Sequence, residues 1–80
     1  MRVTIHRCPV CPVIGAQAAS QATALRRELG VEVQVLDGYH GEYTVTANGR
    51  VIAEKMGDWL PTLQEVQAIL RRQWPEKARP

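Results

Sequence analysis

Apolar and polar side chains alternate at the start of the chain. Val3 and Ile5 are separated by Thr4 and followed by His6. A period of two is typical of a strand with one buried face, so residues 3–6 are predicted to form a strand. Its polar side chains should point away from the core.

From Pro12 the period of the pattern lengthens to three and four residues. The recurring apolar positions are Ile14, Ala18, Ala22, Leu25 and Leu29. This spacing predicts an amphipathic helix that starts at Pro12, and Gly30 is placed to end it. Alanine lines the first turns of this helix, which should allow the helix to lie close to a sheet; these residues are Ala16, Ala18, Ala19, Ala22 and Ala24.

A second alternating run follows the helix directly at residues 31–35, where three valines are separated by Glu32 and Gln34. We interpret it as a second strand. A strand, a helix and a strand joined by such short connections predict a parallel pair with a right-handed crossover.

Two further strand-like runs, residues 42–47 and 50–55, flank the dipeptide Asn48-Gly49. Asn-Gly between such runs is a strong signal for a two-residue hairpin turn. A turn of this length would place Val45 opposite Ile52 and Tyr43 opposite Glu54. Val45 and Ile52 would then share the buried face.

The last apolar pattern predicts a second helix. Thr62 and Glu65 have the spacing of a capping box, and Pro75 is placed to end the helix. The apolar stripe of this helix consists of Leu63, Val66, Ile69, Leu70 and Trp74.

The expected order is therefore β-α-β-β-β-α, the minimum content of a thioredoxin-like domain. Because every strand has a polar side, we expect a two-layer α+β fold with a four-stranded mixed sheet and helices on one face only. We assign residues 1–75 to a single domain and residues 76–80 to a flexible tail.

Composition limits the possible functions. The chain has 80 residues, of which 45% are hydrophobic, so it should form one small domain of moderate stability. A net charge of +2 and an aromatic content of 5% argue against a nucleic-acid-binding surface. No apolar run is long enough to cross a bilayer, and the first six residues do not resemble a signal peptide. We expect a cytoplasmic protein.

Both cysteines of the chain lie in Cys8-Pro9-Val10-Cys11, between the first strand and the first helix. A disulfide across two intervening residues closes too small a loop to stabilise the fold appreciably. At the start of a helix, however, unpaired N–H groups and the helix dipole favour thiolate over thiol. The pKa of such cysteines falls from about 8.5 to roughly 3.5 to 7.5. The motif therefore indicates a redox pair, and the alternative is two cysteines that merely pack as small apolar residues.

Pro12 distinguishes the two cysteines. Proline suits the first helical position, so Cys11 should be the N-cap residue and Cys8 should lie in the preceding loop. Cys11 would then be closer to the helix dipole, whereas we expect Cys8 to be the more exposed sulfur.

The chain resembles the selenoprotein W family of thioredoxin-like proteins from about Val3 to Trp74. The resemblance rests on three segments in this order: Cys8-Pro-Val-Cys11, Gly41-Glu42-Tyr43-Thr44-Val45 leading into Asn48-Gly49, and Glu54-Lys55-Met56-Gly57-Asp58. It implies a thiol-disulfide oxidoreductase or redox sensor that uses Cys8 and Cys11. It further implies a thiol or disulfide protein partner, with glutathione as a possible reductant or thiol partner and no other cofactor.

This chain also departs from the family pattern. Arg7 precedes the first cysteine where an aromatic residue is common, and Pro9-Val10 replaces small residues within the pair. Tyr43 stands where phenylalanine is usual. The connection before the third strand lacks the proline of true thioredoxins, as it does in selenoprotein W relatives. In those relatives selenocysteine occupies the position of Cys11, which together with the helix start favours Cys11 as the attacking sulfur and Cys8 as the resolving one.

Four other residues have a functional and an ordinary interpretation. Arg7 could stabilise a thiolate or could be a solvated residue at a strand end. Trp59 could cover the site, form a partner surface or simply pack against its own loop. His6 and His40 could carry protons, although a polar strand face and a loop are ordinary places for histidine.

Two other classes of function compete with the redox interpretation. The first is a zinc site, because Cys8, Cys11, His6 and His40 are suitable donors, although their spacing matches no common zinc motif. The second is a protein-interaction module in which the polar sheet face or the Trp59 loop binds a partner. In that case the cysteines would only respond to oxidation.

Overall fold

The structure is a computed structural model that describes residues 2–57 and 59–73. Its elements are β1 (Arg2–Arg7), α1 (Pro12–Leu29), β2 (Glu32–Asp37), β3 (Tyr43–Ala47), β4 (Arg50–Glu54) and α2 (Leu63–Gln73). This order confirms the predicted β-α-β-β-β-α arrangement. Asp58, the apolar position Trp74, the helix stop at Pro75 and the tail at residues 76–80 lie outside the described residues.

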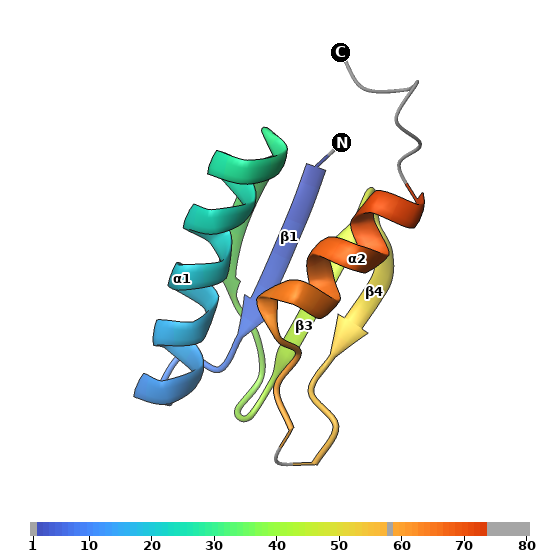
Figure 1. The fold of residues 1–80 in the computed structure, drawn as a ribbon. Coiled ribbons are helices and arrows are strands. Elements are labelled where there is room, and N and C mark those ends of the chain that lie inside the picture. The colour runs from blue at the N-terminus through green and yellow to red at the C-terminus, as the bar shows by residue number, and fades with distance from the viewer. Residues whose placement is uncertain (1, 58, 74–80) are drawn as a thin grey trace.

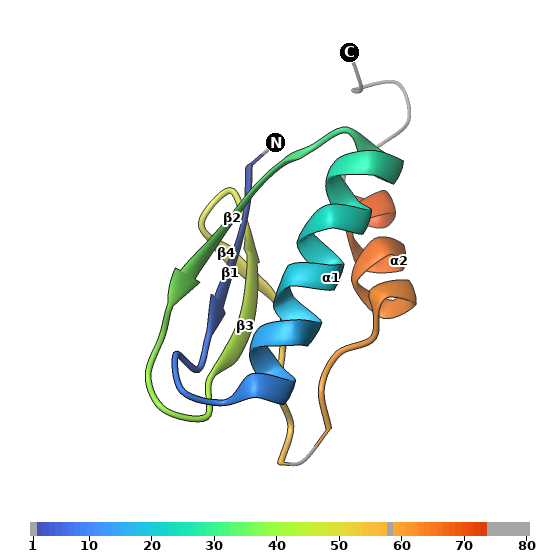
Figure 2. The ribbon, with the colours of Figure 1, turned by 90° about the vertical axis from the view of Figure 1, so that its left-hand side faces the viewer.

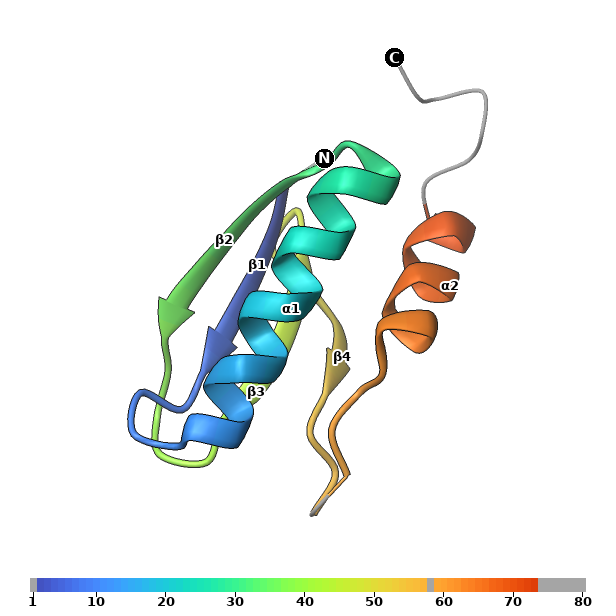
Figure 3. The same ribbon diagram turned by 60° about the vertical axis from the view of Figure 1, so that its left-hand side comes forward.

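The four strands form one mixed sheet in the order β2-β1-β3-β4. β1 and β2 are parallel, as the short connections through α1 predict, and β3 is antiparallel to both β1 and β4. Both helices lie on the same face of the sheet (Figures 1 and 2). α1 packs on β1 and β2, whereas α2 packs on β4 (Figure 3). The two-layer thioredoxin-like fold expected from the sequence is confirmed.

The ends of α1 follow the expected signals. Cys11 is the N-cap with extended backbone angles, and Pro12 occupies the first helical turn. Gly30 ends the helix in the left-handed conformation, with its N–H donating to the carbonyl oxygen of Arg26 at 3.2 Å. Proline lacks the N–H that would be unpaired at this end of a helix, which explains why the helix starts here.

The core lies between the sheet and the two helices. Register brings inward-facing residues into rows across the sheet: Ile5 lies between Val35 and Val45. Of the helix alanines, Ala18 and Ala22 are buried against the sheet as expected, whereas Ala16 and Ala19 are exposed. The opposite face of the sheet carries half-buried polar side chains, namely Thr4, His6, Thr44 and Thr46.

The hairpin differs from its predicted register. Ala47 pairs with Arg50 across the expected turn, where Asn48 and Gly49 both have positive φ. Val45, however, pairs with Ala53 and not with Ile52, because a β-bulge makes Ile52 an extra residue. Tyr43 is consequently not opposite Glu54, which pairs with Thr44. Ile52 is only half-buried, although it still packs against the core.

The start of α2 agrees with a capping interaction, since the N–H of Glu65 donates to the side-chain oxygen of Thr62 at 3.1 Å. Val66 and Leu70 are fully buried, and Leu63 and Ile69 are partly buried. Within residues 2–57 and 59–73, no helix is long and apolar enough to cross a membrane.

A buried polar network connects three parts of the fold. The hydroxyl of Tyr43 donates to Oε1 of Gln21 at 2.7 Å, and Nε2 of Gln21 donates to the carbonyl oxygen of Pro61 at 2.7 Å. Gln17 donates to the same carbonyl at 3.2 Å. Gln21 is not one of the recurring apolar positions of α1, yet its side chain is buried because it joins β3 to the segment before α2. Burial also raises the pKa of the Tyr43 hydroxyl.

We predict that Tyr43→Phe lowers the free energy of unfolding by about 1 to 3 kcal/mol, because the buried Oε1 of Gln21 loses its donor. Tyr39→Phe is the matched control, since the Tyr39 side chain is exposed and its hydroxyl should contribute almost nothing. Urea denaturation of both variants measures the difference. Equal losses would contradict a structural role for the network.

Candidate dithiol site

The two cysteines lie where β1 leads into α1, and both are free thiols. Cys8 is only 3% exposed and belongs to the buried core cluster. Cys11 is partly exposed at the start of the helix. The expectation that Cys8 would be the more exposed sulfur is therefore wrong, because the loop bearing Cys8 is covered by the β2–β3 connection.

Backbone hydrogen bonds join these two loops. The N–H of Cys8 donates to the carbonyl oxygen of Glu42 at 2.8 Å, and the N–H of Gly38 donates to the carbonyl oxygen of Arg7 at 2.8 Å. The β2–β3 connection thus continues the pairing of the sheet past the end of β1. These two hydrogen bonds hold the backbone of Cys8 in place.

Backbone groups of two loops affect the pKa of the Cys8 thiol. Hydrogen bonds from the backbone N–H groups of Gly41, Val10 and Cys11 lower the pKa of the Cys8 thiol. The nearby charge of Arg7 acts in the same direction, whereas burial opposes it. Gly41, the largest contributor, has a φ of 84°, a conformation that glycine adopts readily. Val10 and Cys11 lie just before the first helical residue, so the segment that leads into α1 also acts on the Cys8 thiol.

Arg7 lies at the end of β1 beside the cysteine loop. Its guanidinium forms an ion pair of 2.8 Å with Asp37, a residue at the end of the neighbouring strand. Its positive charge also contributes to the lowered pKa of Cys8, as the smallest of the named causes. Because Asp37 partly neutralises this charge, Arg7 lowers the pKa of Cys8 less than the backbone hydrogen bonds do.

Trp59 is 64% exposed, so the interpretation of a packed loop tryptophan is wrong. Met56 and Trp59 exchange two backbone hydrogen bonds of 2.9 Å, which keep these two residues of the loop close together. Trp59 does not line the groove beside the cysteines, and so it does not cover them.

Exposed apolar side chains gather at the end of the molecule that carries the cysteines. The loops β1–α1, β2–β3 and β4–α2 all lie at this end (Figure 1). We define the apolar rim as the exposed residues of these loops and of the first turn of α1, which are Val10, Val13, Tyr39, Met56 and Trp59. Exposed apolar side chains around a reactive group are typical of a protein-binding surface.

The histidines do not join the cysteines. His6 lies on the polar face of the sheet between Leu36 and Thr44, and His40 is exposed in the β2–β3 connection. Over residues 2–57 and 59–73, no three histidine, cysteine or acidic side chains are grouped closely enough to hold a metal ion. The four donors of the alternative zinc site are therefore not gathered in one place.

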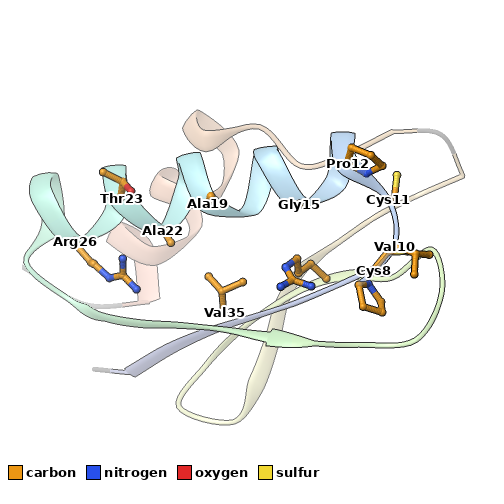
Figure 4. Close-up of a pocket in the computed structure, with 12 residues that line it drawn as sticks. Cys8, Val10, Cys11, Pro12, Gly15, Ala19, Ala22, Thr23, Arg26 and Val35 are labelled. Atoms are coloured by element: carbon orange, nitrogen blue, oxygen red, sulfur yellow. The ribbon is translucent and has the colours of Figure 1, made fainter.

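An open groove of about 540 Å³ leads away from the cysteine pair. Cys8, Cys11 and Pro12 line one end, and Arg26 lies at the other end, between α1 and β2 (Figure 4). Sequence reasoning missed this groove, as well as the contributions of Gly41 and Glu42. Glycine and glutamate in a loop carry no local signal that their backbone will meet a cysteine far away in the sequence.

Comparisons with known proteins support the fold. No family model and no curated protein sequence matches the chain. Solved structures with a similar fold include the following two. One is a protein from Bordetella parapertussis, with 21% identity and a TM-score of 0.78, covering 90% of this chain and 95% of that one. The other is a selenoprotein W-related protein from Vibrio cholerae, with 18% identity and a TM-score of 0.80, covering 90% of this chain and 94% of that one.

We predict that the Cys11→Ser variant, which keeps only Cys8, is alkylated by iodoacetamide with a pH midpoint below that of the same variant unfolded in urea. The unfolded thiol should have a midpoint of about 8.5. Hydrogen bonds that favour the folded thiolate cause the difference. A native midpoint at or above the unfolded one would contradict the geometry.

The same shift predicts how stability depends on pH. Because the folded pKa lies below the unfolded one, this thiolate contributes stability above the unfolded pKa and loses it as the pH falls through the folded pKa. The stability of the Cys11→Ser variant relative to Cys8→Ser/Cys11→Ser should therefore increase as the pH rises between these two values.

Proposed function

We propose that this protein is a small thiol-disulfide oxidoreductase or redox sensor of the selenoprotein W type. The observation that carries the proposal is the placement of two free cysteines together where β1 leads into α1, with the more exposed Cys11 as the N-cap residue. Backbone hydrogen bonds that lower the pKa of the Cys8 thiol support it. A pair used only for packing would not need its buried sulfur prepared as a thiolate. The similarity to the Vibrio cholerae structure supports the same family.

In the proposed reaction Cys11 attacks first, because it is the more exposed sulfur and access limits the rate of thiol exchange. Its thiolate forms a bond with one sulfur of a substrate disulfide. The substrate S–S bond breaks, and the other sulfur leaves as a thiolate that takes a proton from water. The product of this step is a mixed disulfide between Cys11 and the substrate.

Cys8 then resolves the mixed disulfide. Its lowered pKa increases the fraction present as thiolate, which attacks the sulfur of Cys11 and releases the second substrate thiolate. Two electrons pass from the protein to the substrate, and a Cys8–Cys11 disulfide remains. A sulfenic acid substrate would follow the same course, with water as the first leaving group.

Two molecules of a cellular thiol such as glutathione would return the two electrons and become a disulfide themselves. Because this step needs a reducing thiol pool, we propose that the protein works in the cytoplasm. The apolar rim supports a protein as the main disulfide partner, since a small disulfide would need no such surface.

The apolar rim also favours a second candidate, a protein-interaction module in which the cysteines only respond to oxidation. The two functions differ in what happens when both cysteines are removed. Cys8→Ser/Cys11→Ser would leave partner binding intact in an interaction module, whereas it would abolish the capture of a disulfide partner by an oxidoreductase.

We predict that the reduced wild-type protein reacts with hydroxyethyl disulfide to give the intramolecular disulfide. The Cys8→Ser variant should instead stop at a mixed disulfide on Cys11, because the resolving thiol is missing. Mass spectrometry after acid quenching distinguishes the two products, and Cys8→Ser/Cys11→Ser is the unreactive control. A wild-type protein that accumulates only the mixed disulfide would contradict the dithiol mechanism.

A further inference from the structure

The groove beside the cysteines extends far beyond the space that disulfide exchange requires. We call it the α1–β2 groove. Its lining combines the two cysteines and Arg7 with one face of α1, which contributes Gly15, Ala19, Ala22, Thr23 and Arg26, and with Val35 of β2. Its volume of about 540 Å³ lies within the usual range of ligand sites.

The helix wall of the groove consists almost entirely of small side chains. Ala19 and Thr23 are exposed, and they lie beside the stripe of α1 that is buried in the core, represented by Ala18 and Leu25. Because the small side chains do not fill the space above β2, a chain of ordinary width can lie between helix and strand. In Figure 4 Val35 projects from β2 into this space.

The far end of the groove is positively charged. Nη2 of Arg26 donates to the carbonyl oxygen of Val33 at 2.7 Å, which holds the guanidinium over β2. The remaining N–H groups of the guanidinium are available to a carboxylate. In the part of the chain that the structure describes, no acidic side chain forms an ion pair with Arg26. An anionic group is the occupant that this end favours.

The strand wall favours an extended occupant. β2 is an edge strand, so its outer backbone groups have no neighbouring strand within the sheet. An extended peptide can align with such an edge. The 15 helical positions from Cys11 to Arg26 span about 22 Å at 1.5 Å per residue. An extended chain covers this distance in about six or seven residues.

We propose that the α1–β2 groove binds an extended acidic segment of the protein whose disulfide reacts with the cysteine pair. The reacting sulfur lies at Cys11, and a carboxylate about five to seven residues away along the partner chain pairs with Arg26. This inference rests on the proposed function and adds to it a class of substrate. Arg26 is a specificity-determining residue in this arrangement.

The test uses peptides with one cysteine joined to mercaptoethanol by a disulfide. Acidic peptides carry three glutamates five to seven residues from the cysteine, on its N-terminal or its C-terminal side. Matched neutral peptides carry glutamine at the same positions. The second-order rate constant of exchange is measured at low salt for every peptide and for hydroxyethyl disulfide.

The wild-type protein should react about three to five times faster with one of the acidic peptides than with its neutral match, as expected of exposed ion pairs. Arg26→Gln should remove this preference. Arg27→Gln is the matched control, because Arg27 is the next residue of the same helix, carries the same charge and does not line the groove. Equal effects of the two substitutions would overturn the proposal, since they would indicate a general charge effect.

Replacing Arg26 also removes its hydrogen bond to the carbonyl oxygen of Val33. A second experiment therefore blocks the groove without changing its charge. Ala19→Phe should slow the reaction with the preferred acidic peptide at least fivefold more than it slows the reaction with hydroxyethyl disulfide. Ala16→Phe is the control, because Ala16 is exposed on the same helix outside the groove. No difference between the two phenylalanine variants would overturn the proposal.

The reaction with hydroxyethyl disulfide distinguishes a failure of the groove proposal from a failure of the proposed function. A wild-type protein that reacts with hydroxyethyl disulfide but shows no preference for either acidic peptide would overturn the groove proposal alone. A protein that does not react with hydroxyethyl disulfide would overturn the proposed function, and the groove proposal with it.

Discussion

The structure of the site depends on the backbone pairing between the Cys8 loop and the β2–β3 connection. The hydrogen bond from the N–H of Cys8 to the carbonyl oxygen of Glu42 joins the two loops, and the backbone N–H of Gly41 contributes most to lowering the pKa of the Cys8 thiol. A thiolate needs donors that are already in place, because reorganising them would cost part of the stabilisation. The parallel pairing of β1 with β2 brings both loops to the same end of the sheet. The fold thus prepares Cys8 through backbone atoms, which side-chain substitutions in these loops can change only indirectly.

The two cysteines differ in burial and in their backbone surroundings. Cys8 receives the N–H groups but is almost inaccessible, whereas Cys11 is accessible as the N-cap residue. A stabilised thiolate also makes the reduced state more favourable, which shifts a dithiol couple toward oxidising behaviour. The Tyr43–Gln21–Pro61 network braces the same end of the fold, since it joins β3 and α1 to the segment that follows the Trp59 loop. The network therefore connects α1, which begins at the cysteine pair, to the segment beside the apolar rim.

Local signals were sufficient to predict the elements of the fold. The change of period at Pro12, the Asn48-Gly49 turn and the stop at Gly30 depend only on neighbouring residues, and the structure confirms all three. Features that depend on contacts distant in sequence were not predicted. The buried Gln21 and the buried Cys8 each depend on contacts with another element, and the bulge at Ile52 has no signal in the hairpin sequence. For the same reason the motif predicted a candidate site but did not reveal that a distant loop lowers the pKa of Cys8.

We propose that Cys8 and Cys11 form a reversible two-electron couple. It is tested most directly by equilibrating the protein with glutathione buffers of graded ratio, quenching with acid and measuring the species by mass spectrometry. We expect an intramolecular disulfide whose fraction follows a two-electron curve. The stabilised Cys8 thiolate favours the reduced protein, which makes the potential of the couple less negative. A protein that carries glutathione on one cysteine across the whole series, and never forms the internal disulfide, would contradict a two-electron couple of Cys8 and Cys11.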